Sequence, residues 1–533
     1  MNRKNGLRLL ALLIALLMAV ACTASGSTQT AQTTESTAET VTAANNTVEA
    51  TQQAEATVSA EQSAAETAAE VEQSTVEPAA ENATSENDGN TPPDMPDGQG
   101  GTPPDGNGGM GEPPSGGFGG TTAPGGSTSS FEYMATTEIT AADAQADQTY
   151  ESSTADESAL IISTSDAVTI TNPTVTKTGD SNGGDNCNFY GLNAAVLAKD
   201  GASVTISGGT ITSSASGANG VFSYGGNGGS NGAAGDGTTV TISDTVITTT
   251  GSGSGGIMTT GGGVMYANNL TVMTSGQSSA PIRTDRGGGW VYVDGGTYTS
   301  NGLGSPAIYS TAEIHVSNAT LVSNLSEGVC IEGKNSIELT DCDLTANNTQ
   351  CNGNATFLDT IMIYQSMSGD ADSGTSAFTM TGGTLTSKNG HVFHVTNTNA
   401  IITLSQVIIF NEDGDNILLS VCADGWSGGS NITTLNAVNQ SLSGTILVGS
   451  DSTLTLNLTD GALFTGTISG EITNAKGTTV SIAVGTVNVT LDSTSTWTLT
   501  GDTYITSFTG DAANVISNGY TLYVNGVALT GTK

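Results

Sequence analysis

The chain has 533 residues, of which 71 are glycine and only 11 % are charged, and its formal net charge is −39. A chain this acidic repels phosphate backbones, so we expect no nucleic-acid partner. Aromatic residues make up 5 % of the sequence, which is little for a compact globular core but enough for the thin core of a solenoid filled by Val, Ile and Leu.

The first 22 residues have the architecture of a lipoprotein signal peptide. Arg3, Lys4 and Arg8 precede an apolar run over residues 9–21 that is short for a membrane span. The run ends in Met-Ala-Val-Ala-Cys at Cys22 and resembles a bacterial lipobox, with alanine where leucine is usual. The resemblance implies secretion, lipidation of Cys22 and anchoring in the membrane at the bacterial cell surface. The alternative is an ordinary secretory signal with a coincidental cysteine.

Residues 23–130 are expected to form a disordered linker. They contain neither Lys nor Arg, and they pass from an acidic stretch rich in Ala, Thr, Glu and Gln into a Gly/Pro-rich tract over residues 91–126. With almost no large apolar residues, this stretch cannot offset the entropy cost of ordering. We expect it to act as a spacer that holds the folded part away from the membrane.

From residue 131 onward one apolar phrase recurs: hydrophobic, any residue, hydrophobic, four residues, hydrophobic. Where copies follow closely the period is 23 to 26 residues, and insertions stretch it elsewhere to 36 or 41. A fixed period that is lengthened in places by insertions of variable length is typical of a solenoid. The copies begin at Val168, Val204, Val240, Met265, Val291, Ile314, Ile337, Phe378, Ile402, Leu456, Val480, Trp497 and Leu522.

Each copy reads as two short strands joined by a tight turn. The first two apolar residues are two apart and point to one side of a strand. Small and turn-forming residues, such as Gly208-Gly209 and Gly295-Gly296, fill the four-residue gap. A further apolar strand precedes most copies, as at residues 221–224 and 329–332. Two or three short strands per turn of about 24 residues predict a parallel β-helix. An antiparallel sandwich would not repeat one phrase more than ten times.

This coil pattern resembles the right-handed parallel β-helix of the pectin-lyase-like superfamily. Segments 220–229, 280–289, 364–372 and 495–503 further resemble a group of uncharacterised, adhesin-like bacterial surface proteins. The resemblance implies an all-β fold, a single-stranded right-handed parallel β-helix over residues 131–533. It implies no particular activity, because both enzymes and binding proteins use this fold.

The repeat also predicts which residues point outward from the strand that precedes each copy. Coils stack about 4.8 Å apart, so these residues would form a face roughly 30 Å long. Its mixture of aromatic and charged groups suits an extended sugar chain. The alternative is a side of the solenoid packed under the inserted loops. One predicted column is Leu197, Phe222, Met258, Arg283, Tyr309 and Cys330, continued by Met362 and His394, and the other is Lys199, Tyr224, Thr260, Asp285, Thr311, Glu332 and Tyr364.

From this face we take eight candidate ligand-binding residues: Phe222, Tyr224, Arg283, Asp285, Arg286, Tyr309, Glu332 and Lys334. Arg283 and Arg286 are the only arginines beyond the signal peptide, and they flank Asp285. Their guanidinium forks would suit a clamp for a carboxylate or a sugar hydroxyl. The alternative, which we favour, is an Arg–Asp bridge between neighbouring coils.

The sequence identifies no catalytic residue. Polygalacturonases carry a Gly-His-Gly and an Arg-x-Lys segment, and neither is present. Asp285 and Glu332 with a nearby Arg or Lys334 would imitate the site of a polysaccharide lyase, but an acidic solenoid yields such triples by chance. Loops at 179–188, 368–372 and 411–415 are rich in Asp, Asn and Gly and are candidates for calcium binding, with hydrated turns as the alternative.

Five cysteines follow Cys22, and the sequence does not assign partners among them. Cys342 and Cys351 would pair only if a loop folds back.

The sequence as a whole favours a monomeric, lipid-anchored cell-surface protein that acts as an adhesin or carbohydrate-binding module. Its expected partners are the membrane, through the N-terminal lipid, and a polysaccharide or other cell-surface ligand. The first alternative is a lyase or hydrolase acting on pectin-like glycans, and the second is a structural surface protein.

Overall fold

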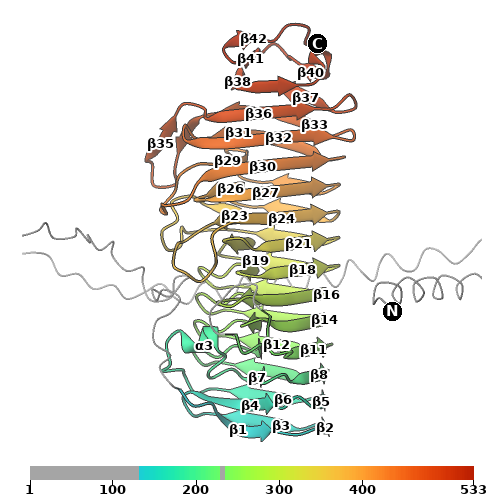
Figure 1. The fold of residues 1–533 in the computed structure, drawn as a ribbon, viewed down its shortest axis with the longest axis vertical. Coiled ribbons are helices and arrows are strands. Elements are labelled where there is room, and N and C mark those ends of the chain that lie inside the picture. Colours follow the sequence, from blue (N-terminus) through green and yellow to red (C-terminus); the bar gives the residue numbers. More distant parts are fainter. Residues whose placement is uncertain (1–130, 228–233) are drawn as a thin grey trace, which may run out of the picture. The chain divides into compact units, whose positions relative to one another are not determined.

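The computed structural model describes residues 131–227 and 234–533, which form a right-handed parallel β-helix. Short strands follow one another around each coil, and successive coils stack in register from β1 to the C-terminal strands (Figure 1). The predicted fold class is therefore confirmed. Three faces of stacked strands enclose the core, and we call them faces 1, 2 and 3 in the order in which the chain visits them.

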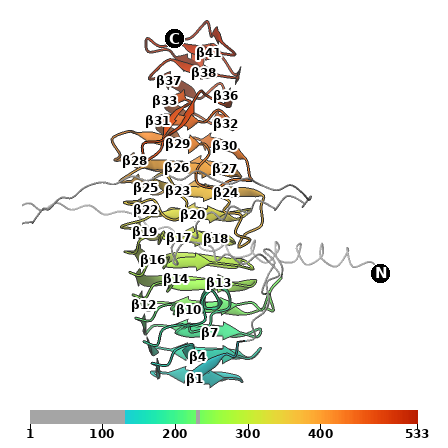
Figure 2. The same ribbon diagram turned by 90° about the vertical axis from the view of Figure 1, so that its left-hand side faces the viewer.

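Face 1 is a sheet of fifteen strands and is turned toward the viewer in Figure 2. Its inward positions are filled by branched aliphatic residues, because period-two alternation places every second side chain in the core. Val196, Val221, Ile257 and Ile282 are all at most 2 % exposed. Its strands are β1 (Met134–Ile139), β4 (Glu157–Ser163), β7 (Val196–Lys199), β10 (Val221–Tyr224), β13 (Ile257–Thr260), β15 (Ile282–Thr284), β17 (Ile308–Ser310), β20 (Val329–Glu332), β23 (Asp359–Tyr364), β26 (His391–Thr396), β29 (Ile417–Val421), β31 (Ser441–Val448), β33 (Leu463–Ser469), β37 (Thr496–Leu499) and β40 (Val515–Ile516).

Face 2 contains the first two apolar residues of the phrase in the copies from Val168 to Ile402 and in the copy that begins at Leu456. Val204 and Ile206 in one coil pair in register with Val240 and Ile242 in the next, and all four are buried. Its strands are β2 (Asp143–Ala146), β5 (Ala167–Thr171), β8 (Ser203–Ser207), β11 (Thr239–Ser243), β14 (Gly263–Thr274), β16 (Gly289–Ser300), β18 (Glu313–Ser317), β21 (Ser336–Thr340), β24 (Thr375–Thr381), β27 (Thr398–Ser405), β30 (Asn431–Val438), β32 (Ser452–Thr459), β36 (Thr486–Leu491) and β39 (Ser507–Thr509).

Face 3 contains the third apolar residue of the phrase. The chain reaches it through a residue in the left-handed region, such as Asn172 (φ 51°) or Asn318 (φ 55°). Asparagine tolerates this conformation, and the turn brings the next apolar side chain back into the core. Its strands are β3 (Thr149–Ser152), β6 (Thr174–Lys177), β9 (Thr210–Ser213), β12 (Val246–Thr249), the second halves of β14 and β16, β19 (Thr320–Ser323), β22 (Asp343–Ala346), β25 (Thr384–Ser387) and β28 (Ile408–Asn411).

After β28 the coils lose their third strand, and here part of the predicted pattern is wrong. Only Asn439 (φ 49°) and Gln440 connect β30 to β31, so no strand of face 3 lies between them. As a result Leu463 is 47 % exposed and its neighbour Phe464 fills the core instead. The copy starting at Val480 is no coil, because its strand pairs antiparallel in a hairpin and leaves Ile482 81 % exposed. Tyr504, the third residue of the next copy, is also exposed.

The remaining elements lie outside the three faces. The hairpin strands project beside the stacked coils, on the side where the one short α-helix of the described residues also lies (Figure 1). The C-terminal end is closed by a small three-stranded sheet. These elements are α3 (Asn186–Phe189), β34 (Glu471–Thr473), β35 (Thr479–Ile482), β38 (Thr503–Ile505), η1 (Ala512–Asn514), β41 (Leu522–Val524) and β42 (Val527–Ala528).

Candidate functional site

The outward column of face 1 has the register that the repeat predicts. Phe222 lies between Leu197 and Met258 in the ladder, and Tyr309 follows Arg283. Cys330, Met362 and His394 continue the column.

The column is not open to solvent, however, because loops pack over it. Its eight residues, from Leu197 to His394, are at most 5 % exposed. Phe222 packs with Ala194 beside α3, Tyr309 packs with Ala355, and Cys422 packs with Ile472 of the β34–β35 hairpin. We call these loops, at residues 180–194, 349–358, 365–374, 422–430 and 470–484, the cover. Of the two alternatives for this face, packing beneath inserted loops is what the structure describes, and a glycan has no open path to the column.

Arg283 and Arg286 each form a buried ion pair and each contact a distant loop. Arg283 donates to Asp285 (2.9 Å), and its guanidinium also reaches Asn188 of α3. Arg286 donates to Asp370 (2.5 Å), a cover residue 84 positions away, and stacks 4.0 Å over the ring of Phe189. Burial raises the pKa of Asp285 to about 7, although Arg283 opposes the shift. Both arginines are therefore held in buried Arg–Asp pairs rather than in an open clamp, but the pairs do not join neighbouring coils as we expected: Asp285 lies in the same coil as Arg283, and Asp370 lies in the cover.

Glu332 accepts hydrogen bonds from two phenol groups, that of its register partner Tyr364 and that of Tyr309 in the neighbouring outward column. Tyr309 donates from 2.6 Å and Tyr364 from 3.1 Å, and the Ser366 hydroxyl also donates. Burial raises the pKa of Glu332, while these hydrogen bonds oppose the shift. Because the carboxylate is enclosed and its lone pairs are occupied, it is not positioned to act on a substrate.

The last two candidates lie at the margin of the cover. Tyr224 is half-buried and contacts the ring of Tyr190 edge-on at 5.7 Å. Lys334 is exposed and pairs with Asp372 at 2.9 Å. Neither residue adjoins an open groove with the other six candidates.

A second polar cluster lies under the cover near face 1. The Ser420 hydroxyl lies 2.7 Å from Nδ1 of both His391 and His394. The Nε2 atom of His394 is 3.3 Å from Asp424, and both of these side chains are fully buried. Burial, with the neighbouring His394, lowers the pKa of His391 to about 3, so its ring is neutral. The side chains of Ser420, His394 and Asp424 are buried, whereas His391 is partly exposed.

Among residues 131–227 and 234–533, no group of three or more His, Cys, Asp or Glu side chains is placed to hold a metal ion. In the candidate calcium loop at 368–372, the Asp370 carboxylate is paired with Arg286.

The five cysteines in residues 131–227 and 234–533 are all free. Cys342 lies in the core of the helix whereas Cys351 lies in the cover. No helix in the described residues is long and apolar enough to cross a membrane. Cys22 lies outside them.

A shallow groove of about 400 Å³ lies on the open side of face 2. One wall is an aromatic column: the rings of Tyr266 and Tyr292 stack at 5.1 Å, and those of Tyr292 and His315 stack at the same distance. The sequence contains the signal for this column, because the register of the repeat places these three residues at one outward position. We call it the aromatic groove. The opposite wall is the next outward column, which contains Asn268, Asp294, Ser317 and Thr340.

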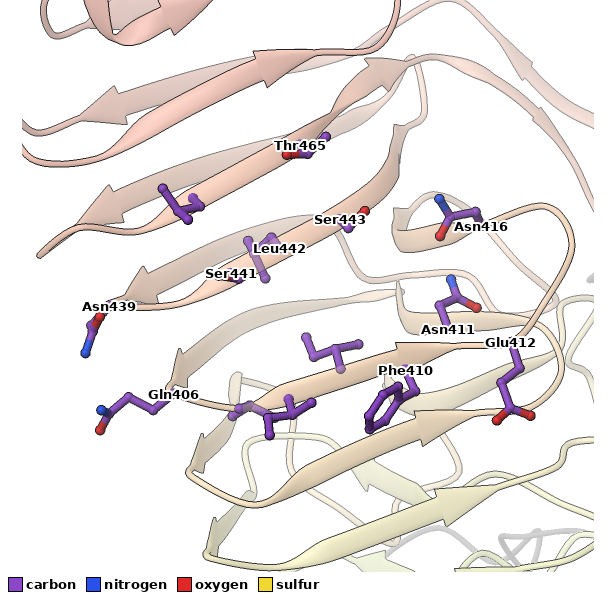
Figure 3. A pocket seen from close by; sticks show the side chains of 14 residues that line it. Gln406, Phe410, Asn411, Glu412, Asn416, Asn439, Ser441, Leu442, Ser443 and Thr465 are labelled. Carbon is purple, nitrogen blue, oxygen red and sulfur yellow. The ribbon is translucent and has the colours of Figure 1, made fainter.

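A larger groove of about 910 Å³ lies where face 3 ends. One wall is β28 with its Phe410 side chain, and the other is the start of β31 with Ser441 and Ser443 (Figure 3). We call it the β28 groove. No sequence motif pointed to it, because it arises from the absence of a strand rather than from a pattern of residues.

Comparisons of the chain with models of protein families, with curated proteins and with solved structures found no match.

Proposed function

We propose that the protein is a lipid-anchored surface adhesin whose β-helix binds a neutral glycan in the aromatic groove. We also propose that its relatives are the pectin-lyase-like β-helices and the adhesin-like surface proteins that its coils resemble. The observation that supports glycan binding is the stacked column Tyr266, Tyr292 and His315, which lies on a face that no loop of the described residues covers.

The aromatic wall offers apolar surface in a form that a sugar ring can use. Tyr266 ends the stack and is 42 % exposed, and its neighbour in register is the small Thr241. One face of its ring is therefore open to the apolar face of a pyranose. The phenol of Tyr292 stays protonated, since burial beside the strand and then Glu313 raise its pKa, and it can donate to a sugar hydroxyl.

The polar wall suits hydroxyl groups rather than carboxylates. Asp294 accepts hydrogen bonds from Asn318 (2.7 Å) and Ser317 (3.0 Å), which lower its pKa and keep it ionised. His315 lies between the carboxylates of Glu313 and Glu338 at 2.8 and 3.0 Å. Three carboxylates against one imidazole repel a uronate, so a neutral sugar chain is favoured over a pectin-like one.

The lyase or hydrolase alternative has less support. Asp285 and Glu332, the carboxylates that would imitate a lyase site, are 5 % and 0 % exposed. A polysaccharide would reach them only if the cover opened, and the buried ion pair between Arg286 and Asp370 helps to hold the cover in place.

The test is a glycan array probed with the full chain, followed by titration of the best neutral glycan. Tyr266→Ala should weaken binding by about fivefold, because an aromatic contact contributes about 1 kcal/mol. The matched control is Tyr504→Ala, which removes another exposed, stacked tyrosine near the C-terminus and should leave affinity unchanged. A blank array, or equal loss in both variants, would refute glycan binding in the aromatic groove.

Mass spectrometry of the mature N-terminus tests the lipid anchor. An unmodified peptide beginning after Cys22 would refute it.

A further inference from the structure

The β28 groove has the form of a missing strand in a stack of parallel strands. β28 pairs with β25 on one side, and no other described strand pairs with it. Across the groove, residues 441–443 of β31 pair with β33 on their far side. β31 pairs with β29 only from Thr445 onward, and the register shifts at the start of that pairing. Two strand edges thus face each other with a groove between them.

The backbone groups of both edges point into this groove. The Ile408 and Glu412 N–H groups donate to Gly383 and Ser387, so the alternate residues Ile409 and Asn411 direct their N–H and C=O groups away from β25. On the other wall, the Gln440 carbonyl accepts from Leu463. By the same alternation Ser441 and Ser443 direct theirs toward β28. Unpaired edges of this kind are templates for an added strand.

At one end of the groove, the side chain of Gln440 shows which kind of group the two strand edges bind. The Gln440 side chain accepts a hydrogen bond from the Val407 N–H at 2.7 Å and donates to the Val407 carbonyl at 2.8 Å. It also donates to the Ser441 carbonyl at 2.7 Å. A carboxamide therefore makes here the bonds that the backbone amide of a further strand would make. Farther along β28 no described side chain replaces the backbone amides of a missing strand in this way.

The side chains around the groove are those of an interrupted core. Ile409 is only partly buried, whereas Leu385, its register partner in β25, is fully buried. On the outer surface Ile408 is 56 %, Phe410 50 % and Leu463 47 % exposed. A strand in the groove would cover Ile409 with its inward residue and contact Ile408 and Phe410 with its outward ones.

We propose that the β28 groove binds an extended polypeptide strand of another protein, which completes face 3 by strand addition. The occupant is a polypeptide because the groove offers paired backbone donors and acceptors and already holds an amide. Its chemistry follows from charge: the only charged wall residue is Glu412, and the chain as a whole carries −39. A segment with alternating apolar residues and a lysine or arginine next to Glu412 fits best. β25 already places Lys388 opposite Glu412, one residue beyond the pair Ser387 and Asn411.

The experiment uses a labelled peptide with the sequence of residues 382–388, Gly-Gly-Thr-Leu-Thr-Ser-Lys, with both threonines changed to valine. Binding to the full chain is measured by fluorescence polarisation, and backbone protection is measured by hydrogen exchange. We expect the peptide to slow exchange at residues 409–411 and 441–443 together. A peptide with proline at the two valine positions lacks two N–H donors and should not bind.

Side-chain variants test the same site without disturbing the backbone. Ile408→Glu and Phe410→Ala should each weaken peptide binding about fivefold or more, because both residues are half-exposed and would be covered by the strand. Ile401→Glu is the control, since Ile401 is 41 % exposed but lies on β27, which has strand partners on both sides. It should bind normally.

Three results would overturn the proposal. The first is that the peptide alters exchange at neither wall. The second is that it binds Ile401→Glu and Ile408→Glu equally. The third is that residues 409–411 and 441–443 are already protected in the full chain without peptide, because the groove would then be filled by this chain or a second copy. Glycan binding at the aromatic groove is measured separately and does not depend on these outcomes.

Discussion

Replacing Arg283 with methionine should destabilise the cover rather than remove a ligand contact. The side chain of Arg283 is 6 % exposed and the side chain of its partner Asp285 is 7 % exposed. Methionine keeps the apolar bulk of the side chain but leaves Asp285 without its cation. The hydrogen bonds from Arg283 to Asn188 and to the Ser278 carbonyl, both 3.2 Å, are also lost.

The size of the effect follows from these contacts. Breaking a buried ion pair by removing one partner costs about 3–5 kcal/mol. Asp285 can take up a proton, since its pKa is already raised to about 7 by burial. This relief places the expected loss near the lower end, about 3 kcal/mol. Changing Asp285→Asn in the same chain removes the stranded charge and should restore most of the loss, because the uncompensated buried charge is the main penalty.

The assay is denaturant unfolding of the full chain combined with local hydrogen exchange, because a solenoid can open one part at a time. Exchange should rise first at residues 186–189 of α3, which Arg283 holds through Asn188. The control is Lys334→Met, which breaks an exposed ion pair and should change stability by less than about 0.5 kcal/mol. If Arg283→Met retained full stability and instead lost glycan binding, the bridge would be refuted and the clamp supported.

Two further predictions concern the titratable groups beneath the cover. The free energy of unfolding should rise by about 1 kcal/mol as the pH falls from 8 to 6.5. The pKa of Asp285 is raised to about 7, so in this range the folded state binds a proton that the unfolded state does not. Asp285→Asn should abolish most of this rise in thermal unfolding curves. His391 contributes in the opposite direction below pH 6.5. Its pKa is lowered to about 3 by burial and by His394, so unfolding takes up a proton and the contribution of His391 to stability falls as the pH falls. In the native chain Cys187 should react with iodoacetamide at least about 100-fold more slowly than a free thiol at neutral pH, because burial raises its pKa to about 11. Rapid labelling of Cys187, read by mass spectrometry, would contradict its buried position in α3.

The sequence was sufficient to predict the interior of most coils. From Val168 to the copy that begins at Ile402, the spacing of apolar residues predicts which side chains fill faces 2 and 3, because a strand alternates with period two and each turn must bring the third residue back inside. It also predicts the ladder on face 1, including Phe222 beside Met258. The aromatic groove could have been predicted in the same way, since Tyr266, Tyr292 and His315 share one outward position.

Beyond residue 440 the same pattern fails in part: Leu456 and Leu458 are buried as predicted, whereas Leu463 and Ile482 are exposed. A phrase of three apolar residues does not distinguish a coil from a hairpin, and Val480 with Ile482 belongs to the hairpin. Whether a coil has two or three strands depends on how the next coil stacks, which a local pattern does not contain.

What the sequence alone determined, then, is the solenoid and its register, because these follow from residues close together in the chain. Only the tertiary structure decided what is accessible. The cover depends on contacts such as Arg286 with Asp370 and Lys476 with the Ala355 carbonyl, which join residues 84 and 121 positions apart. Such contacts bury the ladder that the repeat makes prominent. The loss of one strand after β28 opens instead a groove that no motif marks, because an unpaired edge is a property of neighbouring coils and not of any one of them.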